Sequence, residues 1–161
     1  MNCIKDKPNN EGNIIDPIIP HLESSWIVAT ISNKQNVWNS TNIQINVDSE
    51  EKIGKYFELD TTEHVIKVLH SCEALVSASA FFDGTEGDNY VWLKIIKNNT
   101  VVASKLERII NRDFPHASVA AKPISLTKGD TLKLILEYGG STGNPSIRAS
   151  KDVTFLSVTK I

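Results

Sequence analysis

The stretch YVWLKIIKNNTVVASKLERII, residues 90–110, decides the fold class of this chain. In residues 90–97 aliphatic side chains alternate with aromatic, charged or bulky ones, which is the two-residue period of a β-strand. Asn98-Asn99 is a tight-turn signal that tolerates positive φ, and a second strand follows over residues 101–110. The stretch therefore predicts a β-hairpin, which implies antiparallel pairing.

Segments of the same kind fill the chain from Trp26 onward. They are rich in Val, Ile, Thr and aromatic residues, they are separated by clusters of Asn, Asp, Gly and Ser, and no helical period interrupts them. The predicted strands are residues 26–32, 42–47, 56–59, 65–69, 73–82, 90–97, 101–110, 118–126, 131–138, 146–149 and 153–161. This is more than one open antiparallel sheet normally carries. The chain is therefore predicted to be all-β, as two stacked sheets or a closed barrel, and we expect an antiparallel jelly-roll sandwich.

Length and local composition predict one domain with a leader. A chain of 161 residues suits a single core. Residues 1–25 contain Pro8, Pro17 and Pro20 among Asn and Gly, so regular pairing is difficult there. We interpret residues 1–25 as a leader or linker and residues 26–161 as the jelly-roll domain.

Composition excludes several classes of partner. Hydrophobic residues make up 40% and charged residues 22%, which is typical of a folded globular protein. A net charge of -2 gives no general attraction to nucleic acid, and no apolar run approaches the roughly 20 residues of a membrane helix. The start of the chain lacks the pattern of a secretory signal peptide, so we expect a protein kept in the cell, released by lysis, or cut from a longer chain. The two cysteines, Cys3 and Cys72, are expected to be free thiols rather than a bridge.

The order of seven segments along the chain is distinctive: residues 29–33, 42–45, 56–59, 68–80, 93–99, 125–134 and 155–161. This order resembles the C1q and tumour-necrosis-factor-like (TNF-like) jelly-roll family, especially its versions in bacteriophage virion proteins and bacterial surface proteins. Residues 125–134 resemble the family's hairpin with a Gly-Asp turn. Cys72 stands where that family usually has glycine, and Ala74 where it usually has tyrosine.

The resemblance implies a homotrimer packed around a threefold axis. The function we expect is that of a non-enzymatic head domain of a phage tail fibre or baseplate protein, serving virion assembly, attachment to a host-surface saccharide, or both. Its partners would be other virion proteins and a host cell-wall saccharide, and its location the virion. The tip domain of a bacterial collagen-like or spore-surface filament, at the cell or spore surface, is the alternative.

Two tryptophans are the candidate binding residues. Trp38 lies in a polar loop, and Trp92 lies on the strand face opposite its aliphatic neighbours. An exposed indole can stack on a sugar ring or pack in a subunit interface, because it joins a large apolar area to an N–H donor. For Trp92 we favour a trimer interface shared with Ile96, with saccharide binding as the alternative. Trp38 is the better candidate for saccharide binding, although a loop tryptophan can also fold back on the core.

No constellation of side chains indicates catalysis. An enzyme acting on polysaccharide would need two carboxylates about 5–10 Å apart, and no such pair can be nominated. We therefore predict no enzymatic activity, no catalytic residues and no cofactor. Asp83, Glu86 and Asp88, in a predicted turn over residues 83–89, are weak candidates for calcium, although solvated turn carboxylates are the preferred interpretation.

Overall fold

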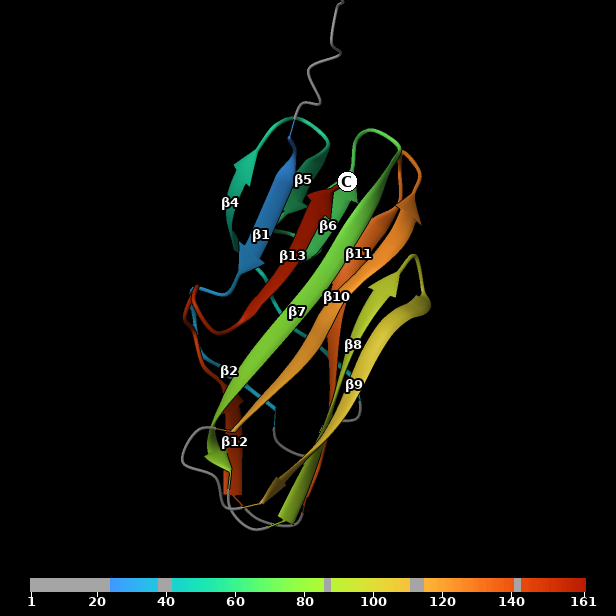
Figure 1. Cartoon of the computed structure of the whole chain (residues 1–161). Helices are drawn as coiled ribbons and strands as arrows, with labels where there is room; N and C mark the ends of the chain where they lie inside the picture. The colour runs from blue at the N-terminus through green and yellow to red at the C-terminus, as the bar shows by residue number, and fades with distance from the viewer. Residues whose placement is uncertain (1–23, 38–41, 86–87, 111–114, 141–142) are drawn as a thin grey trace, which may run out of the picture.

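The computed structural model of the chain describes residues 24–37, 42–85, 88–110, 115–140 and 143–161, and these contain strands but no helix. Figure 1 shows the strands stacked in two layers. The all-β prediction is confirmed. The strands are β1 (Trp26–Thr30), β2 (Gln35–Asn36), β3 (Ile43–Gln44), β4 (Ser49–Ile53), β5 (Phe57–Asp60), β6 (Val65–Val68), β7 (Cys72–Thr85), β8 (Asp88–Lys97), β9 (Thr100–Ile110), β10 (His116–Leu126), β11 (Thr131–Gly139), β12 (Gly143–Ile147) and β13 (Phe155–Lys160).

Both layers are antiparallel sheets. The seven-stranded sheet has the order β2-β12-β7-β13-β1-β4, with β10 on the other edge of β7. The six-stranded sheet has the order β5-β6-β11-β8-β9, with β3 also paired to β11. β7 is the longest strand, with 14 residues, and it pairs with β13 along its first half and with β12 near its end. One strand therefore organises most of the larger sheet.

The hairpin of β8 and β9 forms where the sequence predicts it. Asn98 has φ 53° and Asn99 has φ 114°, in the left-handed region that asparagine tolerates better than most residues. The Asn98 side chain donates to Asp130 Oδ1 at 2.7 Å and accepts from the backbone N–H of Thr131 at 2.9 Å. The tip of this hairpin is thus tied to the turn between β10 and β11.

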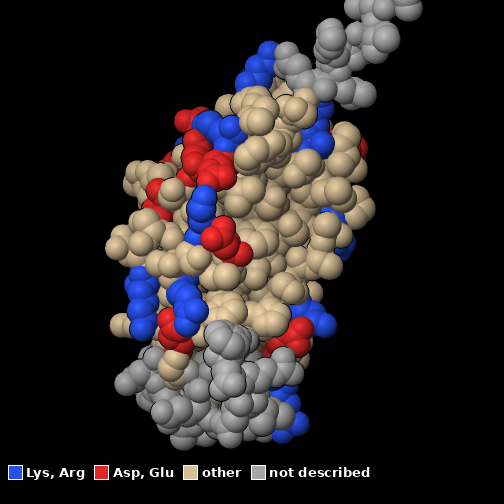
Figure 2. Space-filling model, turned by 60° about the vertical axis from the view of Figure 1, so that its left-hand side comes forward, with Lys and Arg blue, Asp and Glu red and all other residues tan. Residues whose placement is uncertain are grey.

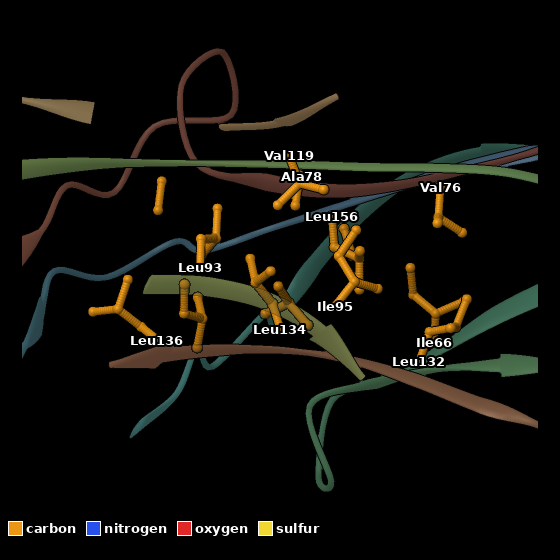
Figure 3. Packing of buried hydrophobic residues seen from close by; sticks show 14 of the residues in the cluster. Ile66, Val76, Ala78, Leu93, Ile95, Val119, Leu132, Leu134, Leu136 and Leu156 are labelled. Atoms are coloured by element: carbon orange, nitrogen blue, oxygen red, sulfur yellow. The ribbon is translucent and has the colours of Figure 1, made fainter. Parts of the chain in front are cut away.

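The core lies between the sheets, where side chains from both layers meet (Figure 3). On β11, Leu132, Leu134 and Leu136 are completely buried and alternate with half-buried neighbours. On β7 the even-numbered residues from Ala74 to Phe82 are buried in the same way. Burying each such leucine is worth roughly 1.5–3 kcal/mol. Because every second side chain points into this core, the others form two outer faces.

β4 is a strand that the sequence analysis missed. It pairs with β1, and Ile53 lies opposite Trp26 at one end of the ladder. Its sequence SEEKI carries three charged residues and is mostly exposed. Edge strands bury little surface and tolerate charge, so no hydrophobic alternation marked this one.

Two turns differ from the sequence prediction. The predicted turn over residues 83–89 is shorter, because β7 continues to Thr85 and β8 begins at Asp88. The Gly129-Asp130 turn does not close a hairpin, since β10 belongs to the seven-stranded sheet and β11 to the six-stranded one. Gly129, with φ 93°, donates its N–H to the Val68 carbonyl at 2.8 Å, and this contact holds the crossing from one layer to the other.

Pro123 lies on an edge strand next to a bulge, where a residue without an N–H is tolerated. β10 pairs with β7 alone among the described strands, and the register shifts between Val119 and Lys122. Of the predicted leader, residues 1–25, only Ser24 and Ser25 are among the described residues. No helix in the described part of the chain is long and apolar enough to cross a membrane.

Candidate binding surface

The outer face of the six-stranded sheet carries exposed aromatic side chains. Tyr90 and Trp92, two residues apart on β8, point to the same side and are 44% and 38% exposed. Across the ladder to β9, Leu106 lies opposite Trp92 and Arg108 opposite Tyr90. We call these four residues the aromatic platform. Leu106 is 58% exposed, so the platform presents apolar area to solvent.

Two glycines support one end of the platform. Gly139 of β11 lies opposite Tyr90, and a Cβ at this glycine would lie 2.1 Å from the tyrosine ring. A Cβ at Gly140 would lie 1.5 Å from Oδ1 of Asn89. Neither position can hold a larger residue unless these side chains move. The Tyr90 ring is therefore seated directly over the β11 backbone.

Lys94 organises the middle of the same face. It points away from the core, since its neighbours Leu93 and Ile95 are fully buried, yet it is only 8% exposed. Its Nζ donates to Glu137 Oε2 at 2.8 Å and to Asn42 Oδ1 at 3.2 Å.

The same ammonium group lies 4.0 Å from the centre of the Trp92 ring, a cation–π contact. One lysine thus fixes Trp92 and Glu137, which face each other across β8 and β11. Lys94 bonds to Oε2 of Glu137, and Oε1 of the same carboxylate is a second hydrogen-bond acceptor on this face.

The face is hollowed beside the platform. A hollow of about 470 Å³ is lined by Asn89, Tyr90, Leu106 and Arg108. A second hollow, of about 460 Å³, lies where β9 and β10 approach each other at the edge of the sandwich. There Lys122 Nζ donates to the Val102 carbonyl at 2.7 Å, which joins the edges of the two sheets.

The predicted binding residues have different outcomes. Trp38 lies outside the described residues. Trp92 lies on the platform, whereas Ile96 is 8% exposed and lies opposite Lys133 on the same face. A trimer interface through Trp92 and Ile96 stays a prediction. Sequence reasoning missed Tyr90, although its two-residue spacing from Trp92 was a signal that both share a face.

Of the three weak calcium candidates, only Asp83 has a described side chain. Asp83 forms an ion pair with Arg148, whose Nε donates to its Oδ1 at 3.0 Å, and this contact lowers the pKa of the Asp83 carboxyl. Glu86 and the side chain of Asp88 lie outside the described residues. Within the described part, no group of three or more His, Cys, Asp and Glu could hold a metal ion. Calcium binding stays an untested prediction.

Cys72 is a free, half-buried thiol, and burial raises its pKa. The other cysteine, Cys3, lies outside the described residues. A raised pKa keeps the thiol protonated near neutral pH, which makes it a poor nucleophile. Cys72 therefore belongs to the packing of the sandwich rather than to a reactive site.

The outer face of the seven-stranded sheet is different in character. Its central strands carry small, neutral or apolar side chains, mostly half-buried, in aligned rows such as Ser77–Ser157 and Ser79–Phe155. Figure 2 shows a broad uncharged area on this side, with charged side chains around its margins. We call this area the uncharged face. Its members are Leu75, Ser77 and Ser79 of β7, Phe155, Ser157 and Thr159 of β13, and Trp26, Val28 and Thr30 of β1.

Comparison with known proteins bears on the fold. No family model matches the chain, and no curated protein matches it in sequence. A crystal structure of murine APRIL at pH 5.0 superposes with a TM-score of 0.63 at 12% identity, covering 86% of this chain and 99% of that chain. Murine APRIL at pH 8.5 gives a TM-score of 0.56 at 13% identity, with the same two coverages. At such low identity the likeness shows the fold alone: the chain is an all-β, TNF-like jelly-roll sandwich.

Proposed function

We propose that this chain is the non-enzymatic, homotrimeric head domain of a phage tail fibre or baseplate protein. The domain assembles through the uncharged face and attaches to a host-surface saccharide through the opposite face. Its other partners are neighbouring virion proteins, and its location is the virion. The phage assignment is supported by the sequence resemblance to virion jelly rolls, and the trimer by the TNF-like fold.

The observation that carries the assembly role is the absence of charge from the central strands of the seven-stranded sheet. The outward residues of β7 from Leu75 to Ser79, and those of β13 and β1, include no Lys, Arg, Asp or Glu. The cores of protein interfaces are depleted of charged residues, because a charge buried without a partner is costly. A cyclic trimer also needs two different patches per subunit, and a broad face next to an exposed sheet edge can supply both.

The attachment role rests on the opposite face. The aromatic platform holds exposed ring surface, and Glu137 provides an oxygen that can accept a hydrogen bond. If the uncharged face points to the threefold axis, the platform points outward. Three copies then face a polyvalent surface together, which multiplies a weak single-site affinity.

Two measurements test this function. Light scattering on the purified chain is expected to give three chain masses, and a monomer over the whole concentration range would contradict the assembly role. Binding to cell walls of candidate hosts, with phage infectivity after deletion of the domain, tests the attachment role. If deletion changes neither wall binding nor infectivity, the attachment role is wrong.

A further inference from the structure

The dimensions of the platform favour a small ligand over a protein. The hollow beside it has a volume of about 470 Å³, and its described lining is Asn89, Tyr90, Leu106 and Arg108. Pockets for small molecules usually enclose about 300–1,000 Å³. A stable protein interface, in contrast, covers about 800 Å² and roughly 20–30 residues on each partner. The hollow is therefore the right size for one or two sugar units.

The charges around the platform select an uncharged ligand. Glu137 and Lys94 neutralise each other as an ion pair, so the face beside Trp92 offers no unpaired charge to an ionic ligand there. A charged group placed against Trp92 would lose its solvation without gaining an oppositely charged partner.

The surface that remains matches a pyranose ring. An aromatic ring has a negative face, which attracts the slightly positive C–H groups on the flat side of a sugar. Sugar hydroxyls are donors, and Glu137 Oε1 can accept from them. We propose that the aromatic platform binds an uncharged pyranose unit of a saccharide, with its C–H face on Tyr90 and Trp92 and a hydroxyl on Glu137. This inference rests on the proposed attachment role and names its ligand class.

The platform is organised before the ligand arrives. Tyr90 is held over Gly139, and Lys94 fixes both Trp92 and Glu137. Side chains that are already ordered lose little conformational entropy on binding, which raises affinity. Lys94 is thus a positioning residue, with its Nζ occupied by Asn42, Glu137 and the indole.

The ligand class can be tested with three probes that share one ring. Methyl glucoside is neutral, methyl glucuronide is anionic, and methyl glucosaminide with a free amine is cationic. Methyl galactoside and methyl mannoside extend the neutral set. Titration of the full chain, followed by the NMR signal of the Trp92 indole N–H, is expected to show binding of at least one neutral glycoside. The two charged analogues of that sugar are expected to bind about tenfold more weakly, which corresponds to roughly 1.4 kcal/mol each.

Substitutions on the platform show which side chains contact the sugar. Tyr90→Ala and Trp92→Ala are expected to weaken binding of the neutral glycoside about tenfold or more, a cost of roughly 1.4 kcal/mol, with Trp92→Ala read by calorimetry. Ile53→Ala is the matched control, because Ile53 is 52% exposed on the other sheet, and it should leave affinity unchanged. Glu137→Gln leaves Lys94 without its anionic partner, so it should shift the preference of the site toward the glucuronide.

Each outcome has a separate meaning when light scattering is run on the same sample. A trimer that binds no neutral glycoside, or that prefers the glucuronide, overturns this inference and leaves the assembly role intact. A monomer that binds the glycoside at Tyr90 and Trp92 supports the inference while the proposed trimer fails. Binding of a host protein to the platform, with no response to any glycoside, also overturns it.

Discussion

The two outer faces of the sandwich rest on one core but carry opposite kinds of side chain. On the seven-stranded sheet, Ser77 lies beside Ser157 of the neighbouring strand. On the six-stranded sheet, Trp92 lies beside Glu137. Small neutral side chains let another sheet approach closely, whereas large aromatic and charged side chains leave hollows of the size of a small ligand. The inward side chains of the alternating strands build the core, and the outward side chains can differ between the two faces. One face can therefore serve assembly while the other serves recognition.

The largest effect is expected from a charge on the uncharged face. Ser79 lies between Phe155 and Ser118 in the sheet, and Ser79→Arg would place an unpaired cation at each of three contacts. Buried charges without partners cost about 3–5 kcal/mol each, so the trimer should dissociate to monomers. Light scattering and sedimentation measure this change.

The matched control for that prediction is Thr61→Arg. Thr61 is exposed in the turn between β5 and β6, at the edge of the six-stranded sheet. This variant should remain trimeric. If Trp92→Glu dissociates the trimer and Ser79→Arg does not, the interface lies at Trp92 and Ile96 and the roles of the two faces are exchanged.

The shared core sets the next largest effect. Leu134 is completely buried on β11, and Leu134→Ala should lower the free energy of unfolding by about 2–5 kcal/mol through lost burial and a cavity. Denaturant unfolding at one fixed protein concentration measures it, because the stability of an oligomer depends on concentration. The neighbouring, outward Ile135→Ala should cost clearly less. Equal costs would mean that the two sides of β11 are not distinguished by burial.

A smaller effect is expected where β11 supports the platform. Gly139→Ala puts a methyl group into the Tyr90 ring, and overpacking of this kind costs about 1–3 kcal/mol. The second substitution Tyr90→Ala in the same chain should restore most of that loss, since it removes the clashing ring. Thermal or denaturant unfolding of the two single variants and the double variant gives the coupling. Additive losses would show that Tyr90 does not lie over Gly139.

The alternation of apolar and polar residues predicted the strands that bury one regular row of side chains. β7, β8 and β11 appear close to their expected bounds, and the outward direction of Trp92 follows from its place between Val91 and Leu93. β4 escaped because an edge strand of sequence SEEKI has no apolar stripe. The role of the Gly129-Asp130 turn was not predicted, because a sequence does not distinguish a turn within one sheet from a turn that connects two sheets.

The candidate site was less predictable than the fold. Lys94 meets Asn42 and Glu137, which are 52 and 43 residues away in the chain. These contacts depend on which strands are neighbours and on their register, and alternation within one strand specifies neither. The role of Gly139 likewise depends on its register with Tyr90. What the sequence predicts is therefore the side to which a residue points, not the residues that it meets there.

The smallest predicted effect concerns an ion pair at the edge of the six-stranded sheet, remote from both functional faces. Lys67 Nζ lies 2.5 Å from Asp60 Oδ2, and hydrogen bonds from Lys67 and from the backbone N–H groups of Glu63 and Thr62 lower the pKa of Asp60 to about 2. A carboxyl whose folded pKa is depressed contributes stability above its unfolded value of 3.8, and this contribution is lost as the pH falls toward about 2. The Lys67 side chain is exposed and that of Asp60 is half-buried at the sheet edge, so the change in unfolding free energy should be slight. An NMR titration of the Asp60 carboxyl carbon should give a midpoint near 2, and Lys67→Met should move it upward.

Because this pair lies on the six-stranded sheet, Lys67→Met should not alter the trimer. A change of mass in that variant would mean that the edge of this sheet, rather than the uncharged face, contacts a neighbouring subunit.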